Sequence, residues 1–296
     1  MISFLIPTYN FVCTKLVNAL CHDIADTRIN CEVIVMDDGS TDLSTIKENQ
    51  IINNYPMCRF IQNPTNIGRA AIRNKLAQTA KYPKLVFLDA DTLPCQIGFV
   101  RLYIDYATNN KANVVCGGIR YRTGNDAVAC PLRLCFGLAN EANTASQRNA
   151  NPYNKFSSAN FMIDKYTFLQ YQFDESICKY GHEDTLFGKV LEQNNIPITH
   201  IDNPVYHDDH DTSNQFLSKT RLAIDTLVTI ENKIGSHSRL LNVYNRIKPF
   251  QLHFILAACF LTFRRIIETN LLGRRPSLSL FNFYKLCYLC FVKLSA

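Results

Sequence analysis

The sequence lacks low-complexity runs and any repeat of fixed period, and glycine and proline number only 11 each. These absences argue against a disordered chain and against a solenoid. Because 47% of the 296 residues are hydrophobic and 19% are charged, the chain can bury a sizeable core. Its length suits one large α/β domain with an appendage.

Two sequence signals are also missing. The first expected strand, ISFLIP, is followed by TYN and not by the glycine-rich loop of dinucleotide-binding proteins, which excludes a dinucleotide-dependent oxidoreductase. The first residues lack the basic n-region of a signal peptide. We therefore expect the 12 cysteines to be free, mostly buried thiols in a reducing compartment. The CxxC of Cys287 and Cys290 has no second pair, so we expect it to bind no metal.

Apolar runs of strand length alternate with helix-like segments through the first 91 residues. Strands are expected at 2–7, 31–38, 57–63 and 84–88, and helices at 14–25, 42–54 and 69–80. Continuous apolar strands between helices indicate a Rossmann-like, mostly parallel sheet that is covered on both faces. Farther on, we expect strands at 114–121 and 196–201, a strand leading into a helix over 157–168, and helices at 181–195 and 215–234.

Ligands of such sheets collect beyond the carboxyl ends of the strands. Here the first strand, the second and the one at 84–88 end in polar residues, namely Thr8 and Tyr9, Asp37 and Asp38, and Asp89 and Asp91. Hard cations such as Mn²⁺ and Mg²⁺ prefer oxygen ligands, so Asp89 and Asp91 are candidate metal ligands. The alternative is a solvated loop. Asp37 and Asp38 could accept hydrogen bonds from a base or ribose, or could cap the next helix, as Ser40 or Asp42 could also do.

Three later segments carry further candidates. In NIGRAAIRN, Arg69 and Arg73 share a helix face and could bind a diphosphate, or be surface charges. In GHED, Asp184 could deprotonate an acceptor hydroxyl while Glu183 orients it, or both could complement a helix N-terminus. In YHDDHD, His207 is favoured over His210 as a metal ligand, and a solvated acidic loop is the alternative.

The order and spacing of these segments resemble the family-2 glycosyltransferases of the GT-A fold, which are inverting enzymes. The match covers roughly the first 210 residues, from ISFLIPTYN through VIVMDDGSTD, NIGRAAIRN and FLDADT to GHED and YHDDHD. The resemblance implies a metal on the diphosphate bound by Asp91 and His207, and Asp184 as the base. It implies a nucleotide site of Pro7, Thr8, Tyr9, Asp37, Asp38, Arg73 and Asp89, and a sugar and acceptor pocket of Gly117, Gly118, Ala159 and Asn160.

The resemblance also implies an activity. We expect a hexosyl- or N-acetylhexosaminyltransferase that uses a UDP-sugar, with GDP- and dTDP-sugars left open. The QxxRW motif of processive synthases is absent, as is any tryptophan, which favours addition of a single sugar. The alternative is a GT-A-fold protein that binds sugars or nucleotides without turnover.

The positive charge of the chain, +6 overall, lies in its tail. From Arg246 onward eight residues are Lys or Arg and one, Glu268, is acidic. The apolar segment 252–263 is too short to span a bilayer, and Lys285 interrupts the segment 277–294. Apolar helices flanked by basic residues favour an anionic membrane surface, although packing on the catalytic domain or on a second copy is the alternative.

We therefore expect a catalytic domain over 1–213, with a nucleotide-binding half to 95 and an acceptor-binding half from 96, and a helical extension over 214–296. The expected acceptor is a glycan or a lipid-linked sugar in cell-surface polysaccharide or glycolipid synthesis, at the inner face of the cell membrane. No nucleic-acid partner is expected, and a homo-oligomer is left open.

Overall fold

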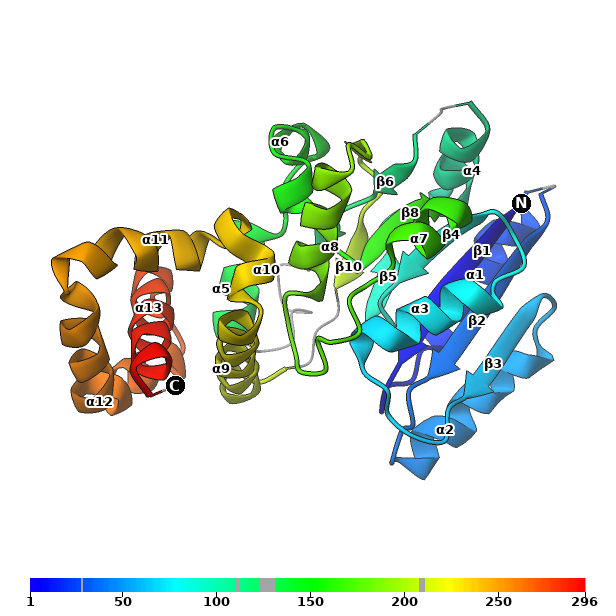
Figure 1. Ribbon diagram of the computed structural model, residues 1–296. Coiled ribbons are helices and arrows are strands. Elements are labelled where there is room, and N and C mark those ends of the chain that lie inside the picture. The colour runs from blue at the N-terminus through cyan, green and yellow to red at the C-terminus, as the bar shows by residue number, and fades with distance from the viewer. Residues whose placement is uncertain (28, 110–111, 123–130, 208–210, 296) are drawn as a thin grey trace. The chain divides into compact units, whose positions relative to one another are not determined.

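Strands and helices alternate in the first part of the chain, and helices alone make up its end (Figure 1). The computed structural model describes residues 1–296 except 28, 110–111, 123–130, 208–210 and 296. The chain forms two units. The first comprises Met1–Arg122, Ala142–Cys178 and Phe187–Asp209, and the second Thr123–Glu141, Lys179–Leu186 and His210–Ala296. The second unit thus contains the expected extension together with two stretches from earlier in the sequence.

A seven-stranded sheet forms the centre of the first unit, in the order β3-β2-β1-β4-β8-β6-β9. Of these strands β8 runs antiparallel to both neighbours and the other pairs are parallel, which confirms the mostly parallel sheet. The strands are β1 (Ile2–Thr8), β2 (Cys31–Asp37), β3 (Cys58–Gln62), β4 (Lys84–Leu88), β6 (Val114–Cys116), β8 (Asn160–Asp164) and β9 (Ile198–His200).

A second, three-stranded sheet lies in the same unit. Its central strand β10 (Val205–His207) is antiparallel to β5 (Thr92–Pro94) and parallel to β7 (Ile119–Arg120). The sequence predicts one strand over 114–121, and this is wrong because the Gly pair divides it between the two sheets. Gly118 has a φ of +91°, a left-handed conformation that ends the strand.

Helices cover both faces of the large sheet. Alternate residues of β1 point to opposite faces, so that Phe4 packs with α1 (Thr14–Ala25) and α4 (Phe99–Asn109), whereas Leu5 packs with α3 (Arg69–Thr79) and α7 (Lys165–Tyr171). Both clusters are fully apolar in their centres, as expected for a sheet buried on both sides. The remaining short elements of this unit are α2 (Leu43–Gln50), η1 (Ile51–Asn54), α6 (Ala145–Asn149) and η2 (Tyr153–Lys155).

The second unit is helical. Its helices are α5 (Pro131–Asn140), α9 (Ser213–Thr229), α10 (Glu231–Ile234), η3 (Gly235–His237), α11 (Arg239–Ile247), η4 (Lys248–Phe250), α12 (Leu252–Leu271) and α13 (Leu278–Ser295), while α8 (Glu183–Gln193) begins in it and ends in the first unit. Side chains of α13 fill its core, where Phe281, Tyr284 and Cys287 meet Phe260 of α12. Cys287 and Cys290 are buried free thiols in this packing.

The apolar helices of the second unit can be compared with a membrane span. Among the described residues, no single helix has the length and apolar character needed to cross a bilayer. One bent pair, Arg239–Phe250 with Leu252–Leu271 at 113°, meets that test by length and composition.

A buried arginine of α6 ties together segments of the first unit. Arg148 donates from Nε to His200 Nδ1 at 3.1 Å and from Nη2 to the carbonyl oxygen of Ile201 at 2.7 Å. Burial, together with the charge of Arg148, lowers the pKa of His200 to about 4 from an ordinary 6.5, against a hydrogen bond to Pro152 O that raises it. The imidazole is therefore neutral in the folded chain at neutral pH.

This pair predicts a loss of stability in mild acid. The pKa of His200 is lower in the folded than in the unfolded chain, so protonation of the unfolded chain favours unfolding. The stability that depends on neutral His200 is therefore fully present above pH 6.5, and it is lost as the pH falls toward 4. We expect the native chain to lose about 2 kcal/mol more between pH 7 and pH 5 than His200→Gln, measured by urea unfolding. His22→Gln, at an exposed position, should behave as the native chain; a parallel loss in His200→Gln would contradict the assignment.

Candidate functional site

The polar ends of β1 and β2 lie side by side at the carboxyl edge of the large sheet. Thr8 is the register partner of Asp37, and the Asp38 amide donates to the carbonyl oxygen of Thr8 at 2.8 Å. The last residue pair between β1 and β4 is Leu5 with Phe87, and Pro7 lies beyond it. The N–H that proline lacks therefore removes no hydrogen bond between β1 and β4. Tyr9, the next residue, is exposed. The strand ends meet as the sequence predicts.

Asn10 joins the two loops that follow these strands, and sequence reasoning did not single it out. Its side-chain Oδ1 accepts from the backbone amides of Thr41 and Asp42 at 2.9 and 3.0 Å, and its own amide donates to Ser40 Oγ at 2.7 Å. Asn10 has a φ of +49°, which asparagine tolerates better than most residues. An asparagine at the end of PTYN is a turn signal that could have been found.

Asp37 and Asp38 organise backbone at this edge. The Ser40 amide donates to Asp37 Oδ2 at 3.0 Å, and the amides of Ile67 and Gly68 donate to the Asp38 carboxylate at 2.8 and 3.0 Å. Neither caps α2, because the N-cap is Asp42, which accepts from Ser44 N. The two aspartates thus shape the loops around the strand ends, and their contact with a nucleotide stays a prediction.

The close approach of these loops requires a glycine at position 39. Gly39 has a φ of +70°, and a Cβ placed on it would lie 2.5 Å from the backbone N of Asn66 and from the backbone C of Thr65. Backbone cannot yield as the end of a flexible side chain can. This requirement was also missed from the sequence, where Ser40 and Asp42 beside this glycine were considered only as helix caps.

A tight turn places Asp89 and Asp91 after β4. The carbonyl oxygen of Asp89 accepts from the Thr92 amide at 3.2 Å and from Thr92 Oγ1 at 2.7 Å, and the Asp89 amide donates to Ala159 O at 3.1 Å. Thr92 then begins β5, where it pairs with His207 of β10. The pairing of β5 with β10 therefore brings His207 to the turn.

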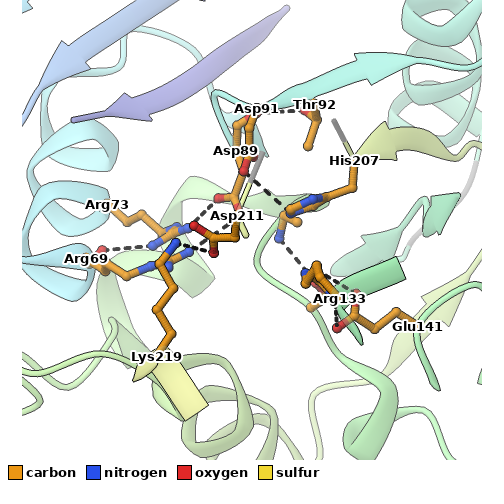
Figure 2. A network of polar contacts seen from close by, with 12 residues as sticks. Arg69, Arg73, Asp89, Asp91, Thr92, Arg133, Glu141, His207, Asp211 and Lys219 are labelled. Carbon is orange, nitrogen blue, oxygen red and sulfur yellow. Dashed lines mark hydrogen bonds and ion pairs between the residues drawn. The ribbon is translucent and has the colours of Figure 1, made fainter. Parts of the chain in front are cut away.

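Asp89, Asp91 and His207 form a candidate metal centre (Figure 2). One potential ligand atom from each lies within 4.8 Å of the other two, and His207 Nε2 is 3.7 Å from Asp91 Oδ2. His207 Nδ1 is buried and has no hydrogen-bond partner among the residues that the structure describes. Two carboxylates and an imidazole with an unsatisfied nitrogen fit Mn²⁺ or Mg²⁺. His210, the other candidate, lies outside the described residues.

Two arginines of α3 bracket Asp89 (Figure 2), and both project from the helix face that their spacing predicts they share. Arg73 is 1% exposed; it donates from Nη2 to Asp89 Oδ1 and from Nη1 to the carbonyl oxygen of Arg69. The guanidinium of Arg69 is 45% exposed and lies 3.7 Å from Asp89 Oδ2. Burial opposes ionisation of Asp89, but Arg73, Arg69 and His207 outweigh it and lower its pKa. Arg73 therefore contacts Asp89 from the buried interior, whereas Arg69 contacts it from the solvent-exposed side.

The four residues expected to line the sugar and acceptor pocket are buried in the first unit. Asn160 donates from Nδ2 to the carbonyl oxygens of Gly118 and Asn203, each at 2.9 Å. A Cβ on Gly117 would lie 2.3 Å from the backbone oxygen of Asn203, so packing alone requires that glycine. Gly118 is favoured by its φ of +91°, and a Cβ on it would lie 2.4 Å from Nη1 of the buried Arg148. Ala159 is buried beside them. Their contact with a sugar stays a prediction.

Asp184 and Glu183 occupy the first turn of α8 in the second unit. The Thr185 amide donates to Asp184 Oδ1 at 2.6 Å, and Glu183 is buried. Two residues with positive φ, Gly181 at +99° and His182 at +68°, form the turn before them. Burial lowers the pKa of His182 although Glu183 acts in the opposite direction. The position suits acids that complement a helix N-terminus, and the role of Asp184 as a base stays a prediction.

Comparison with known sequences identifies related proteins. The family model described as glycosyl transferase family 2 matches residues 3–166. An uncharacterized glycosyltransferase of Haemophilus influenzae is 36% identical over 91 residues. That alignment spans 31% of this chain and 36% of the relative, so it covers about a third of the length of each.

Solved structures share the fold over nearly the whole chain. Staphylococcal TarS (S. aureus, residues 1–349) has a TM-score of 0.53 at 19% identity, covering 99% of this chain and 91% of that one. The mannosyltransferase PcManGT of Pyrobaculum calidifontis, in complex with GDP-Man and Mn²⁺, has a TM-score of 0.59 at 14% identity, with 99% and 86% covered. Both are GT-A glycosyltransferases, which confirms the fold class expected from the sequence.

The crowding at Gly39 predicts a selective effect of one methyl group. Gly39→Ala should lower the free energy of unfolding by about 3 kcal/mol or more, because it adds a backbone clash to the strain of a positive φ. Gly98→Ala is the matched control, since Gly98 has a φ of +81° but nothing within 4 Å of its Cβ position. It should lose only about 1 kcal/mol in urea unfolding. Equal losses would show that the loops are not closely packed.

Proposed function

The chain belongs to glycosyl transferase family 2, and on that premise we propose that it moves a single sugar from a nucleotide-sugar to an acceptor hydroxyl with inversion at the anomeric carbon. The observation that carries the proposal is the cluster of Asp89, Asp91 and His207, whose imidazole has a buried nitrogen without a protein partner among the described residues. It lies after β4 and at the end of β10, where an α/β sheet presents its ligands.

The donor site is proposed around this cluster. Asp91 and His207 would hold Mn²⁺ or Mg²⁺, which when bound offsets the negative charge of the donor diphosphate. Asp89, held by Arg73, would contact the ribose, while the exposed Tyr9 is available to the base. A UDP-sugar is the proposed donor, of the hexose or N-acetylhexosamine type. TarS, which shares the fold, has been solved with UDP-GlcNAc.

The transfer step is proposed as a single displacement. Asp184 takes the proton of the acceptor hydroxyl, and Glu183 orients that hydroxyl. The hydroxyl oxygen forms a bond to the anomeric carbon as the bond from that carbon to the diphosphate oxygen breaks. The nucleoside diphosphate leaves with the bonding electron pair, and attack from the opposite face inverts the configuration.

The proposed acceptor is a glycan or a lipid-linked sugar in cell-surface polysaccharide or glycolipid synthesis. Without the QxxRW motif of processive synthases, one sugar is added at each encounter. The other candidate, a protein that binds a nucleotide-sugar without turnover, has the same donor site and differs in the role of Asp184.

The metal assignment predicts donor binding that depends on a cation. In a thermal-shift screen of UDP-, GDP- and dTDP-sugars, stabilisation by the correct donor should require Mn²⁺ and vanish with EDTA. Asp91→Asn and His207→Ala should each weaken this binding by about tenfold or more, because each removes a ligand. Asp26→Asn, an exposed carboxylate elsewhere in the first unit, is the control and should bind as the native chain. Metal-dependent binding that survives in both ligand variants would refute the assignment.

The base assignment predicts a loss of turnover without a loss of binding. Asp184→Asn keeps the size of the side chain but cannot accept the proton, so release of nucleoside diphosphate should fall about 10²- to 10⁴-fold. The thermal shift with donor and Mn²⁺ should stay unchanged. Native rates in this variant would refute Asp184 as the base. Donor binding by the native chain without turnover, over a panel of acceptors, would favour the non-catalytic alternative.

A further inference from the structure

Helix α12 carries large apolar residues on its packed side and also on its exposed side. His253, Ala257, Phe260, Ile267 and Leu271 are buried on the packed side. A helix on the surface of a globular protein normally keeps its large apolar residues on the side that faces the core. The uncovered side of α12 therefore requires an explanation that the packing of the second unit does not give.

The uncovered side carries several large apolar side chains along the length of the helix. Ile255, Leu261 and Ile266 are each between 61% and 70% exposed. They are joined there by exposed Leu252, Phe254 and Phe263, and Phe250 is exposed just before the helix begins. The other apolar segment of the tail differs, because α13 directs Phe281, Tyr284 and Cys287 into the core. Most of the exposed apolar side chains of the tail thus belong to α12, and α13 contributes Phe283 and Leu294.

Basic residues outnumber acids in this part of the chain. Glu268 is the only acid from Arg246 to the end, and it accepts from Arg221, Arg264 and the hydroxyl of Tyr284. Its charge is therefore compensated within the second unit. Exposed Arg265, Arg274 and Arg275 have no acidic partner among the residues that the structure describes.

We propose that the exposed face of α12 is a docking surface for a bilayer that contains anionic lipid, and that α12 lies along the interface. Apolar side chains enter the boundary of the acyl chains while the arginines meet the headgroups. A helix crossing the bilayer would instead bring Arg264, Arg265 and Glu268 toward the hydrocarbon. A second copy of the chain fits less well, because a symmetric contact would place like charges together.

This surface would hold the chain at a membrane that contains anionic lipid, where a lipid-linked acceptor is also held. The location is inferred from α12 and from the charge of the tail, independently of donor chemistry. Vesicle binding can therefore fail while the proposed transfer reaction stands, and the reverse also holds.

The apolar part of the surface is tested by co-sedimentation of the full chain with vesicles of phosphatidylcholine containing a third phosphatidylserine. The double variant Ile255→Ser and Ile266→Ser should lower the partition coefficient at least about tenfold, because two large apolar side chains that would be transferred from water into the bilayer are removed. The matched control, Leu43→Ser with Ile97→Ser, changes two exposed apolar residues of the first unit and should bind as the native chain.

The charged part is tested with the double variant Arg274→Glu and Arg275→Glu. Its binding should fall about tenfold or more, whereas Lys15→Glu with Lys47→Glu, which changes the net charge equally at exposed sites of the first unit, should have little effect. Native binding should weaken with salt and with neutral vesicles. Equal binding by these two double variants and their controls would overturn the proposal. So would a dimer in sedimentation that the Ile255→Ser and Ile266→Ser variant dissociates, because the face would then contact a second copy.

Discussion

The contact between Arg73 and Asp89 is the constraint on which the site in the first unit depends. The Arg73 guanidinium is 1% exposed, and the free-energy cost of removing it from water is offset only if an opposite charge is fixed beside it. Asp89 at the end of β4 supplies that charge. The position of Asp89 sets the turn to Thr92, and Thr92 begins the strand that pairs with β10. His207 reaches Asp91 through this sequence of contacts.

The same contact separates the functions of two carboxylates that stand two residues apart. Asp89 faces two arginines, whose charges compensate its own and lower its pKa despite burial. Asp91 Oδ2 lies 3.7 Å from Nε2 of the His207 imidazole, a ring that is charged only when protonated. A cation is therefore attracted more by Asp91 than by Asp89, since the field of Asp89 is already offset. This difference supports Asp91 as the principal metal ligand and a positioning role for Asp89.

Sequence reasoning succeeded where the signal was local. Apolar strands that end in Asp37 and Asp89 place their carboxylates at the same sheet edge whatever the rest of the chain does. It had no means to show that Arg73 is buried beneath Asp89, because burial depends on packing against distant segments. The two glycines at 117 and 118 illustrate the same limit, as the atoms that would clash with a Cβ belong to Arg148 and Asn203. In contrast, Asn10 is a local turn residue, and closer attention to turn chemistry could have identified it.

The tail shows a different limit and explains the net charge of the chain. Composition treats the segments of α12 and α13 alike, since both are apolar and carry basic residues. Packing distinguishes them, because α13 fills the core of the second unit and α12 has an exposed side. In the first unit, Arg59, Arg73 and Arg101 each pair with a carboxylate, whereas Arg265, Arg274 and Arg275 are exposed without one among the described residues. Unpaired exposed charge dominates the field that a protein presents to its surroundings. The excess of positive charge is thus a surface property of the second unit, which also exposes the apolar side chains of α12, and the proposed contact with an anionic bilayer uses both.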